Sequence, residues 1–218
     1  MSDYVIPEIK ATEAEMISLR HYLHANPELS LEEFNTSELV ASKLTEWGYQ
    51  VTRGLGKTGV VGSLSKGDSP RTIGLRADMD ALPIEETTGL PWASTVSGKM
   101  HACGHDGHTT ILLAAAKYIA SPACQFNGTV HLIFQPAEEA IGGADLMIKD
   151  GLFEQFPCER IFGLHNMPGL PVGKLGFYAG NFMASADTVK ITLTGYGGHG
   201  AHPDRKSTRL NSSHGYIS

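Results

Sequence analysis

Three short apolar runs in this 218-residue chain are each followed at once by side chains of the kind that bind metals. Apolar runs that alternate with helical segments are typical of an α/β domain with a largely parallel sheet. In such a sheet, ligands gather at the carboxyl ends of the strands. The runs are residues 72–76, 129–134 and 160–164, and the groups that follow them are Asp78 and Asp80, Glu138 and Glu139, and His165. The sequence therefore predicts an α/β fold, mainly a parallel sheet, with one polar site at its carboxyl edge.

The N-terminal quarter of the chain is predicted to be helical. Apolar residues at helical spacing cover residues 12–47 and are interrupted at Asn26-Pro27. Ser30 followed by Glu33 resembles a capping box that would open the second helix. We therefore expect two helices before the first strand.

The rest of the chain continues the alternation. Asp106 or Thr109 is expected to cap a buried helix running through residues 111–119, and residues 142–150 are expected to form another helix. Period-2 or continuous apolar patterns predict further short strands. These strands are expected at residues 49–52, 59–64 and 188–194.

Composition excludes several classes of protein. A net charge of −6 and a pI of about 5.9 argue against a general binder of nucleic acid or of anionic membranes. The first residues lack the basic and apolar layout of a signal peptide. Three cysteines form too sparse and odd a set for a secreted disulfide framework. We expect a cytoplasmic protein.

Residues 100–108 hold three histidines, a cysteine and an aspartate, which are ligands for borderline-soft divalent metals. Cys103 and His105 are two positions apart, so on an extended segment both can reach one metal. His101 has the same spacing and is a rival ligand, whereas His108 is expected to support or pack against the site. A purely structural zinc site is the alternative interpretation of this cluster.

The acidic pairs suggest distinct roles for neighbouring carboxylates. Adjacent residues that leave a strand point in different directions, so one of Glu138 and Glu139 can bind metal while the other acts as general base. One of Asp78 and Asp80 is expected to hydrogen-bond a ligand histidine and fix its tautomer. A solvated acidic turn is the alternative interpretation of the glutamate pair.

Six separated segments of the chain carry short motifs that can be compared, in order, with those of a known protein family. They are Arg20-His-Tyr-Leu-His24 with Pro27-Glu28, Arg76-Ala-Asp-Met-Asp-Ala-Leu-Pro-Ile84, residues 100–108, Gln135-Pro-Ala-Glu-Glu139, Gly163-Leu-His165 and Gly197-Gly-His199. Together they resemble the M20 metallopeptidase family, in the amidohydrolase branch that includes hippurate hydrolases and indole-acetyl-amino-acid hydrolases. The resemblance covers about residues 12–204.

The resemblance implies roles for individual residues. Glu138 corresponds to the general base, and Asp80 aligns with the carboxylate that orients the metal site. His199 matches a histidine of the lid domain that reaches into the partner subunit's active site and polarises the substrate carbonyl. The residues that correspond to ligands of a two-metal site are Cys103, His105, Glu139 and His165.

The same resemblance implies a domain plan. Residues 1–185 would form the first part of a catalytic metallohydrolase domain, and residues 186–204 the start of a lid and dimerisation domain. Residues 205–218 resemble translated vector or adapter sequence, so His214 is not counted as a ligand. Family members continue further and carry a final metal-ligand histidine. We therefore expect a C-terminally truncated amidohydrolase whose full-length form is a homodimer or higher homo-oligomer.

The predicted reaction is hydrolysis of the amide bond in small N-acyl amino acids of the hippurate type. Metal-activated water would attack while Glu138 acts as general base, and the metals with His199 would stabilise the oxyanion. A thiolate ligand favours zinc, cobalt or nickel, and the resemblance adds manganese. The alternative is an inactive truncated fragment that at most binds metal.

Overall fold

The computed structural model describes residues 5–181 and 189–192. The chain divides into two compact units, Met1–Pro168 and Gly169–Ser218, and every helix and strand assigned in the described residues lies in the first. The helices are α1 (Pro7–Ala11), α2 (Glu13–Ala25), α3 (Phe34–Glu46), α4 (His105–Ala120), α5 (Gly143–Lys149) and α6 (Leu152–Gln155). The strands are β1 (Gln50–Leu55), β2 (Gly59–Lys66), β3 (Thr72–Asp78), β4 (Gly128–Gln135) and β5 (Arg160–Gly163).

The five strands form one mixed sheet in the order β1-β2-β4-β3-β5. β3 runs parallel to both β4 and β5, whereas β2 is antiparallel to β1 and β4. Asp78 is in register with Gln135, and Arg76 with Gly163, so the three parallel strands end at one edge. The predicted α/β fold is confirmed. The expected ligands follow β3, β4 and β5, which are the parallel strands of the sheet.

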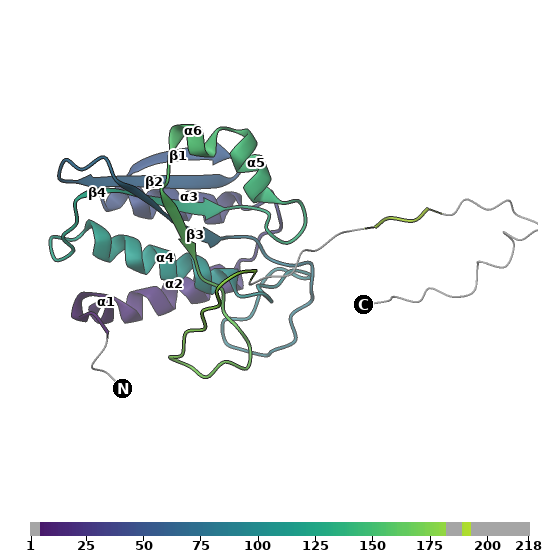
Figure 1. Ribbon diagram of the computed structural model, residues 1–218. Helices are drawn as coiled ribbons and strands as arrows, with labels where there is room; N and C mark the ends of the chain where they lie inside the picture. The colour runs from purple at the N-terminus through teal and green to yellow at the C-terminus, as the bar shows by residue number, and fades with distance from the viewer. Residues whose placement is uncertain (1–4, 182–188, 193–218) are drawn as a thin grey trace, which may run out of the picture. The chain divides into compact units, whose positions relative to one another are not determined.

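Helices cover both faces of this sheet (Figure 1). α3 and α4 pack on one face, α2 packs on α4, and the short α5 and α6 lie over the other face. Strand β4 shows the alternation that this layering requires, because Leu132 and Phe134 enter the larger core and Ile133 enters the smaller one. Burial on both faces makes β4 a fixed platform for the residues that follow it.

Helix α4 begins earlier than the sequence suggested. The expected caps, Asp106 and Thr109, lie inside its first turns, and Gly104 stands at the N-cap with φ +98°. Glycine tolerates this left-handed backbone, so the chain turns into the helix there. Thr109 instead donates from its hydroxyl to the carbonyl oxygen of Asp78 at 2.8 Å.

The expected capping box before α3 is also wrong. α3 starts at Phe34, and its N-cap residue Glu33 makes no capping bond; the carboxylate of Glu28 instead accepts the N–H groups of Asn35 at 3.0 Å and Thr36 at 2.8 Å. Ser30 donates to Asp80 at 2.7 Å, while Glu33 is fully buried beneath the end of β4. Both side chains have partners in the interior, and these contacts replace the local capping bonds.

Several expectations fall largely outside the described residues. They are the strand at 188–194, the lid segment at 186–204 and the tail at 205–218, so the domain boundaries remain predictions. Of the helices in the described part, none is both long enough and apolar enough to cross a membrane.

Candidate metal centre

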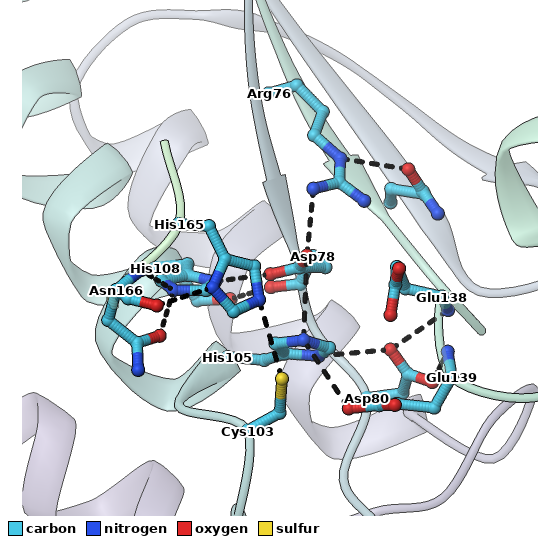
Figure 2. Close-up of polar contacts among 12 residues, drawn as sticks. Arg76, Asp78, Asp80, Cys103, His105, His108, Glu138, Glu139, His165 and Asn166 are labelled. Carbon is cyan, nitrogen blue, oxygen red and sulfur yellow. Dashed lines mark hydrogen bonds and ion pairs between the residues drawn. The ribbon is translucent and has the colours of Figure 1, made fainter. Parts of the chain in front are cut away.

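The ends of β3, β4 and β5 and the N-terminus of α4 bring the predicted ligands together (Figure 2). Cys103, His105 and His165 each offer one ligand atom within 4.8 Å of the others. The Cys103 sulfur lies 3.4 Å from Nε2 of His165. His105 is the first residue of α4 and is fully buried, whereas His165 is exposed.

Carboxylates surround the His105 ring. Its Nδ1 lies 3.3 Å from Asp80, and its Nε2 lies 3.5 Å from Asp78 and 3.7 Å from Glu139. Glu138 also belongs with His105 and Glu139 to a group whose ligand atoms lie within 4.8 Å of one another. The structure thus brings both glutamates of the sequence pair to the same imidazole.

Asp80 joins the two halves of the centre. Its carboxylate accepts hydrogen bonds from the backbone N–H groups of Glu138 at 3.0 Å and Glu139 at 3.1 Å. Burial opposes its ionisation, but the contact with His105 and the hydrogen bonds from Ser30 and these amides outweigh that effect and lower its pKa. Asp80 is therefore a carboxylate that fixes both the glutamate loop and the His105 ring.

The turn after β4 is supported from below by Glu33. Ala137 is fully buried and has φ +50°, a left-handed backbone that costs free energy in a residue other than glycine. Glu33 accepts its N–H at 2.8 Å and the hydroxyl of Thr58 at 2.6 Å. This contact holds the strained turn that places Glu138 and Glu139.

Asp78 occupies a separate position from Asp80. It accepts hydrogen bonds from Nδ1 of His108 at 2.7 Å and from Arg76 at 2.8 Å. Burial opposes its ionisation, yet the His108 bond and the charges of Arg76 and His105 lower its pKa to about 2. Asp78 is an ionised carboxylate directed mainly at His108.

The electrostatics fit a bound cation. Burial, followed by contact with Glu139 and the charges of Asp78 and Glu138, raises the pKa of the Cys103 thiol to about 12. Thiolate, imidazole and carboxylate donors in one place are the set that divalent transition metals prefer, and a bound cation favours the thiolate. In the described part of the chain, Nε2 of His105 and Oε1 of Glu139 are buried without hydrogen-bond partners. Their unused lone pairs fit metal ligation.

Other predicted residues lie elsewhere. His101 is buried with its ring centroid 6.4 Å from that of His24, and it belongs to none of the ligand groups found in the described residues. His199 and His202 lie outside the described residues. Sequence reasoning assigned Glu33 to a capping box and so missed its supporting role, and it missed Asn166, which no local pattern marks.

Comparisons with known proteins show the family to which the chain belongs. Residues 74–211, more than half of the chain, match the peptidase family M20/M25/M40. The chain is 54% identical over 201 residues to the hippurate hydrolase of Campylobacter jejuni, covering 92% of this chain and 52% of that protein. It is 44% identical to the N-acetyl-L-cysteine deacetylase of Bacillus subtilis, covering 89% of this chain and 46% of that protein.

A solved structure gives the same result. The YXEP protein of Bacillus subtilis, described as a dinuclear metal binding peptidase from the M20 family, superposes with a TM-score of 0.70 at 42% identity. The match covers 75% of this chain and 45% of that one. The chain therefore spans about half the length of the relatives that it matches.

Proposed function

Because the chain belongs to the peptidase family M20/M25/M40, we propose that it supplies the metal centre and general base of a metal-dependent amidohydrolase. The substrates proposed are small N-acyl amino acids, cleaved at the amide bond. The names of the two curated relatives, a hippurate hydrolase and an N-acetyl-L-cysteine deacetylase, support this class, since both substrates are amino acids acylated on nitrogen.

One observation carries the proposal. The loop before α4 and the segments after β4 and β5 converge on His105, and they bring a thiol, a pair of glutamates and a second imidazole within ligand distance of it. An isolated structural zinc site formed by residues 100–108 would need no glutamates from β4 and no histidine from β5. Convergence from distant parts of the chain favours a reaction centre.

The residues proposed to hold two divalent metals are Cys103, His105, Glu139 and His165. When bound, such ions polarise a carbonyl oxygen and make water a nucleophile near neutral pH. The thiolate favours zinc, cobalt or nickel, and manganese is the fourth candidate. The unused lone pairs of His105 and Glu139 support ligation at these two residues.

Glu138 is the proposed general base. Its side chain is exposed, so the carboxylate is accessible, and the hydrogen bond from its backbone N–H to Asp80 holds the backbone of Glu138 in place. It would accept a proton from the attacking water as the new C–O bond forms. It would then return that proton to the leaving nitrogen as the C–N bond breaks, giving a carboxylic acid and an amine.

Two further parts of the proposal concern residues outside the described ranges. His199 is proposed to polarise the substrate carbonyl from the partner subunit of a homodimer or higher homo-oligomer. Residues 186–204 would begin the lid that carries it. A cytoplasmic setting is proposed with the small-molecule substrate.

The proposal is tested with Glu138→Ala, assayed for release of glycine from N-benzoylglycine and for bound metal. We expect turnover to fall about 10²- to 10⁴-fold with the metal content unchanged. Glu154→Ala is the matched control, because Glu154 is also an exposed glutamate but lies in α6. Turnover unchanged by Glu138→Ala would contradict the proposed base.

Two other outcomes are informative. Bound metal without turnover in the unaltered chain would favour the alternative of a fragment that only binds metal. Loss of metal in Glu138→Ala would make Glu138 a ligand and contradict its assignment as base.

A further inference from the structure

A series of polar contacts, here called the His108 relay, runs beside the proposed centre and ends at the proposed ligand His165. Its members are Arg76, Asp78, His108, Asn166 and His165 (Figure 2). His108 lies in the first turn of α4 and is only 2% exposed. Its ring packs edge-on against His165, with 4.6 Å between the centroids.

The contacts of His108 define which of its nitrogens carries the proton. The backbone N–H of Asn166 can only donate, so Nε2 of His108 at 3.0 Å must be the acceptor. The ring then carries its proton on Nδ1, which donates to Asp78 at 2.7 Å. Oδ1 of the Asn166 side chain lies 2.5 Å from Nε2 of His108, and because an oxygen cannot donate, the amide has to turn its NH2 group there when Nε2 is an acceptor.

Asn166 passes this constraint to His165. With its N–H tied to His108, the carbonyl of Asn166 accepts Nδ1–H of His165 at 2.7 Å. The Nε2 atom of His165 is then unprotonated, and it lies 3.4 Å from the sulfur of Cys103. The relay thus turns the lone pair of His165 toward the other ligands.

Gly104 makes room for this arrangement. A Cβ atom at Gly104 would lie 2.7 Å from the side-chain oxygen of Asn166, and its φ of +98° disfavours any other residue. The glycine that starts α4 is therefore also the residue that lets Asn166 reach His108.

We propose that Asp78, His108 and Asn166 are positioning residues that fix the ring orientation and tautomer of His165, so that its Nε2 faces Cys103. The inference rests on the proposed function in taking Nε2 of His165 as a ligand atom. A metal-ligating histidine commonly donates its other N–H to a carbonyl or carboxylate, which sets its tautomer. In this chain the carbonyl that does so is itself held by a buried histidine and aspartate.

The first test reads the tautomer directly in the metal-free chain at pH 8. Two-bond ¹H–¹⁵N correlation spectra identify the protonated nitrogen of each histidine ring, and His165→Gln assigns the signal. We expect His165 and His108 to be protonated at Nδ1. Protonation of His165 at Nε2 in the unaltered chain would overturn the proposal, and His165→Gln serves only to assign the signal.

Three variants then separate the relay from simple burial. His108→Leu should lower the ratio of Nδ1–H to Nε2–H at His165 roughly fivefold, the weight of one ordinary hydrogen bond. His108→Gln should restore the ratio, because its amide can donate to Asp78 and accept from Asn166. His131→Leu is the matched control, since His131 is also buried and bonded through Nδ1, but to Ser63 in β2.

A second measurement uses cobalt(II) as the probe. In His108→Leu the affinity should fall about 10- to 100-fold, read from the thiolate-to-cobalt absorption, and His108→Gln should recover it. An unchanged tautomer ratio and unchanged affinity in His108→Leu would overturn the relay. Failure of the proposed function is distinguishable, because it shows as no turnover or no metal while the tautomer in metal-free protein still reports on the relay.

Discussion

The carboxyl ends of β4 and β5 deliver neighbouring parts of the proposed centre, but the protein holds them in different ways. Beyond β4, buried carboxylates bond the backbone directly, with Glu33 accepting from Ala137 and Asp80 from both glutamates. β5 pairs only with β3 among the described strands, and its four residues are exposed. Beyond it, His165 depends on the contact between His108 and Asn166.

The difference separates stability from ligand geometry. Removing Glu33 or Asp80, the carboxylates that bond the turn after β4, leaves buried N–H groups without acceptors, which destabilises the fold. Removing a side chain beyond β5 exposes little apolar surface and leaves few buried polar groups unpaired. Its effect should therefore appear in metal binding. The free energy of unfolding of the metal-free chain, measured by urea denaturation, therefore distinguishes the two regions.

Glu33→Ala should have the largest effect. It removes the acceptor of two buried donors, the N–H of Ala137 and the hydroxyl of Thr58. We expect the free energy of unfolding to fall by about 2 to 4 kcal/mol. Glu32→Ala is the control, because within the described residues the Glu32 side chain forms only an exposed ion pair with Lys99, and its loss should cost less than about 1 kcal/mol. Equal losses in the two variants would refute the special support of β4.

Glu33 also shows where sequence reasoning stops. The strands and the ligands beyond them could be predicted, because apolar runs and polar exits are local patterns. The partners of Glu33 lie 25 and 104 positions away in the sequence. A glutamate that caps a helix and a glutamate that is a buried acceptor look the same in the sequence. The contact of Asn166 with His108 spans 58 positions and likewise depends on how β5 and α4 pack.

Gly104→Ala tests the link between the two regions and should have an intermediate effect. The left-handed backbone at φ +98° disfavours alanine, and the new methyl group would displace the Asn166 side chain. We expect a loss of about 1 to 2 kcal/mol in unfolding free energy. Gly107→Ala in the same helix is the control, since its nearest contact is 4.0 Å away and its effect should be neutral or stabilising. A neutral Gly104→Ala would argue against the strained start of α4.

Glu33→Gln should produce a smaller change that depends on pH. Burial raises the pKa of Glu33 above 4.5, against hydrogen bonds from Thr58 and the Ala137 amide. The folded form then binds the proton more tightly than the unfolded form. The stability that Glu33 contributes in this way is fully present below about pH 4.5 and is lost as pH rises through the folded-state pKa. Glutamine stays neutral, so the variant should gain stability relative to the unaltered chain as pH rises from 4 to 7. A trend in the opposite direction would mean that the buried carboxylate is stabilised as the anion.

His165→Ala should have the smallest effect on the metal-free fold. The side chain is exposed and follows an edge strand, so the free energy of unfolding should change by no more than about 0.5 kcal/mol. Added zinc stabilises the folded form in proportion to its affinity, and each tenfold loss of affinity removes about 1.4 kcal/mol of that gain. The variant should therefore match the unaltered chain without zinc and fall behind it with zinc. Leu164→Ala is the control, because the neighbouring exposed residue has no ligand atom. A large loss without zinc would show that the β5 exit supports the fold as the β4 exit does, and the contrast between the two would fail.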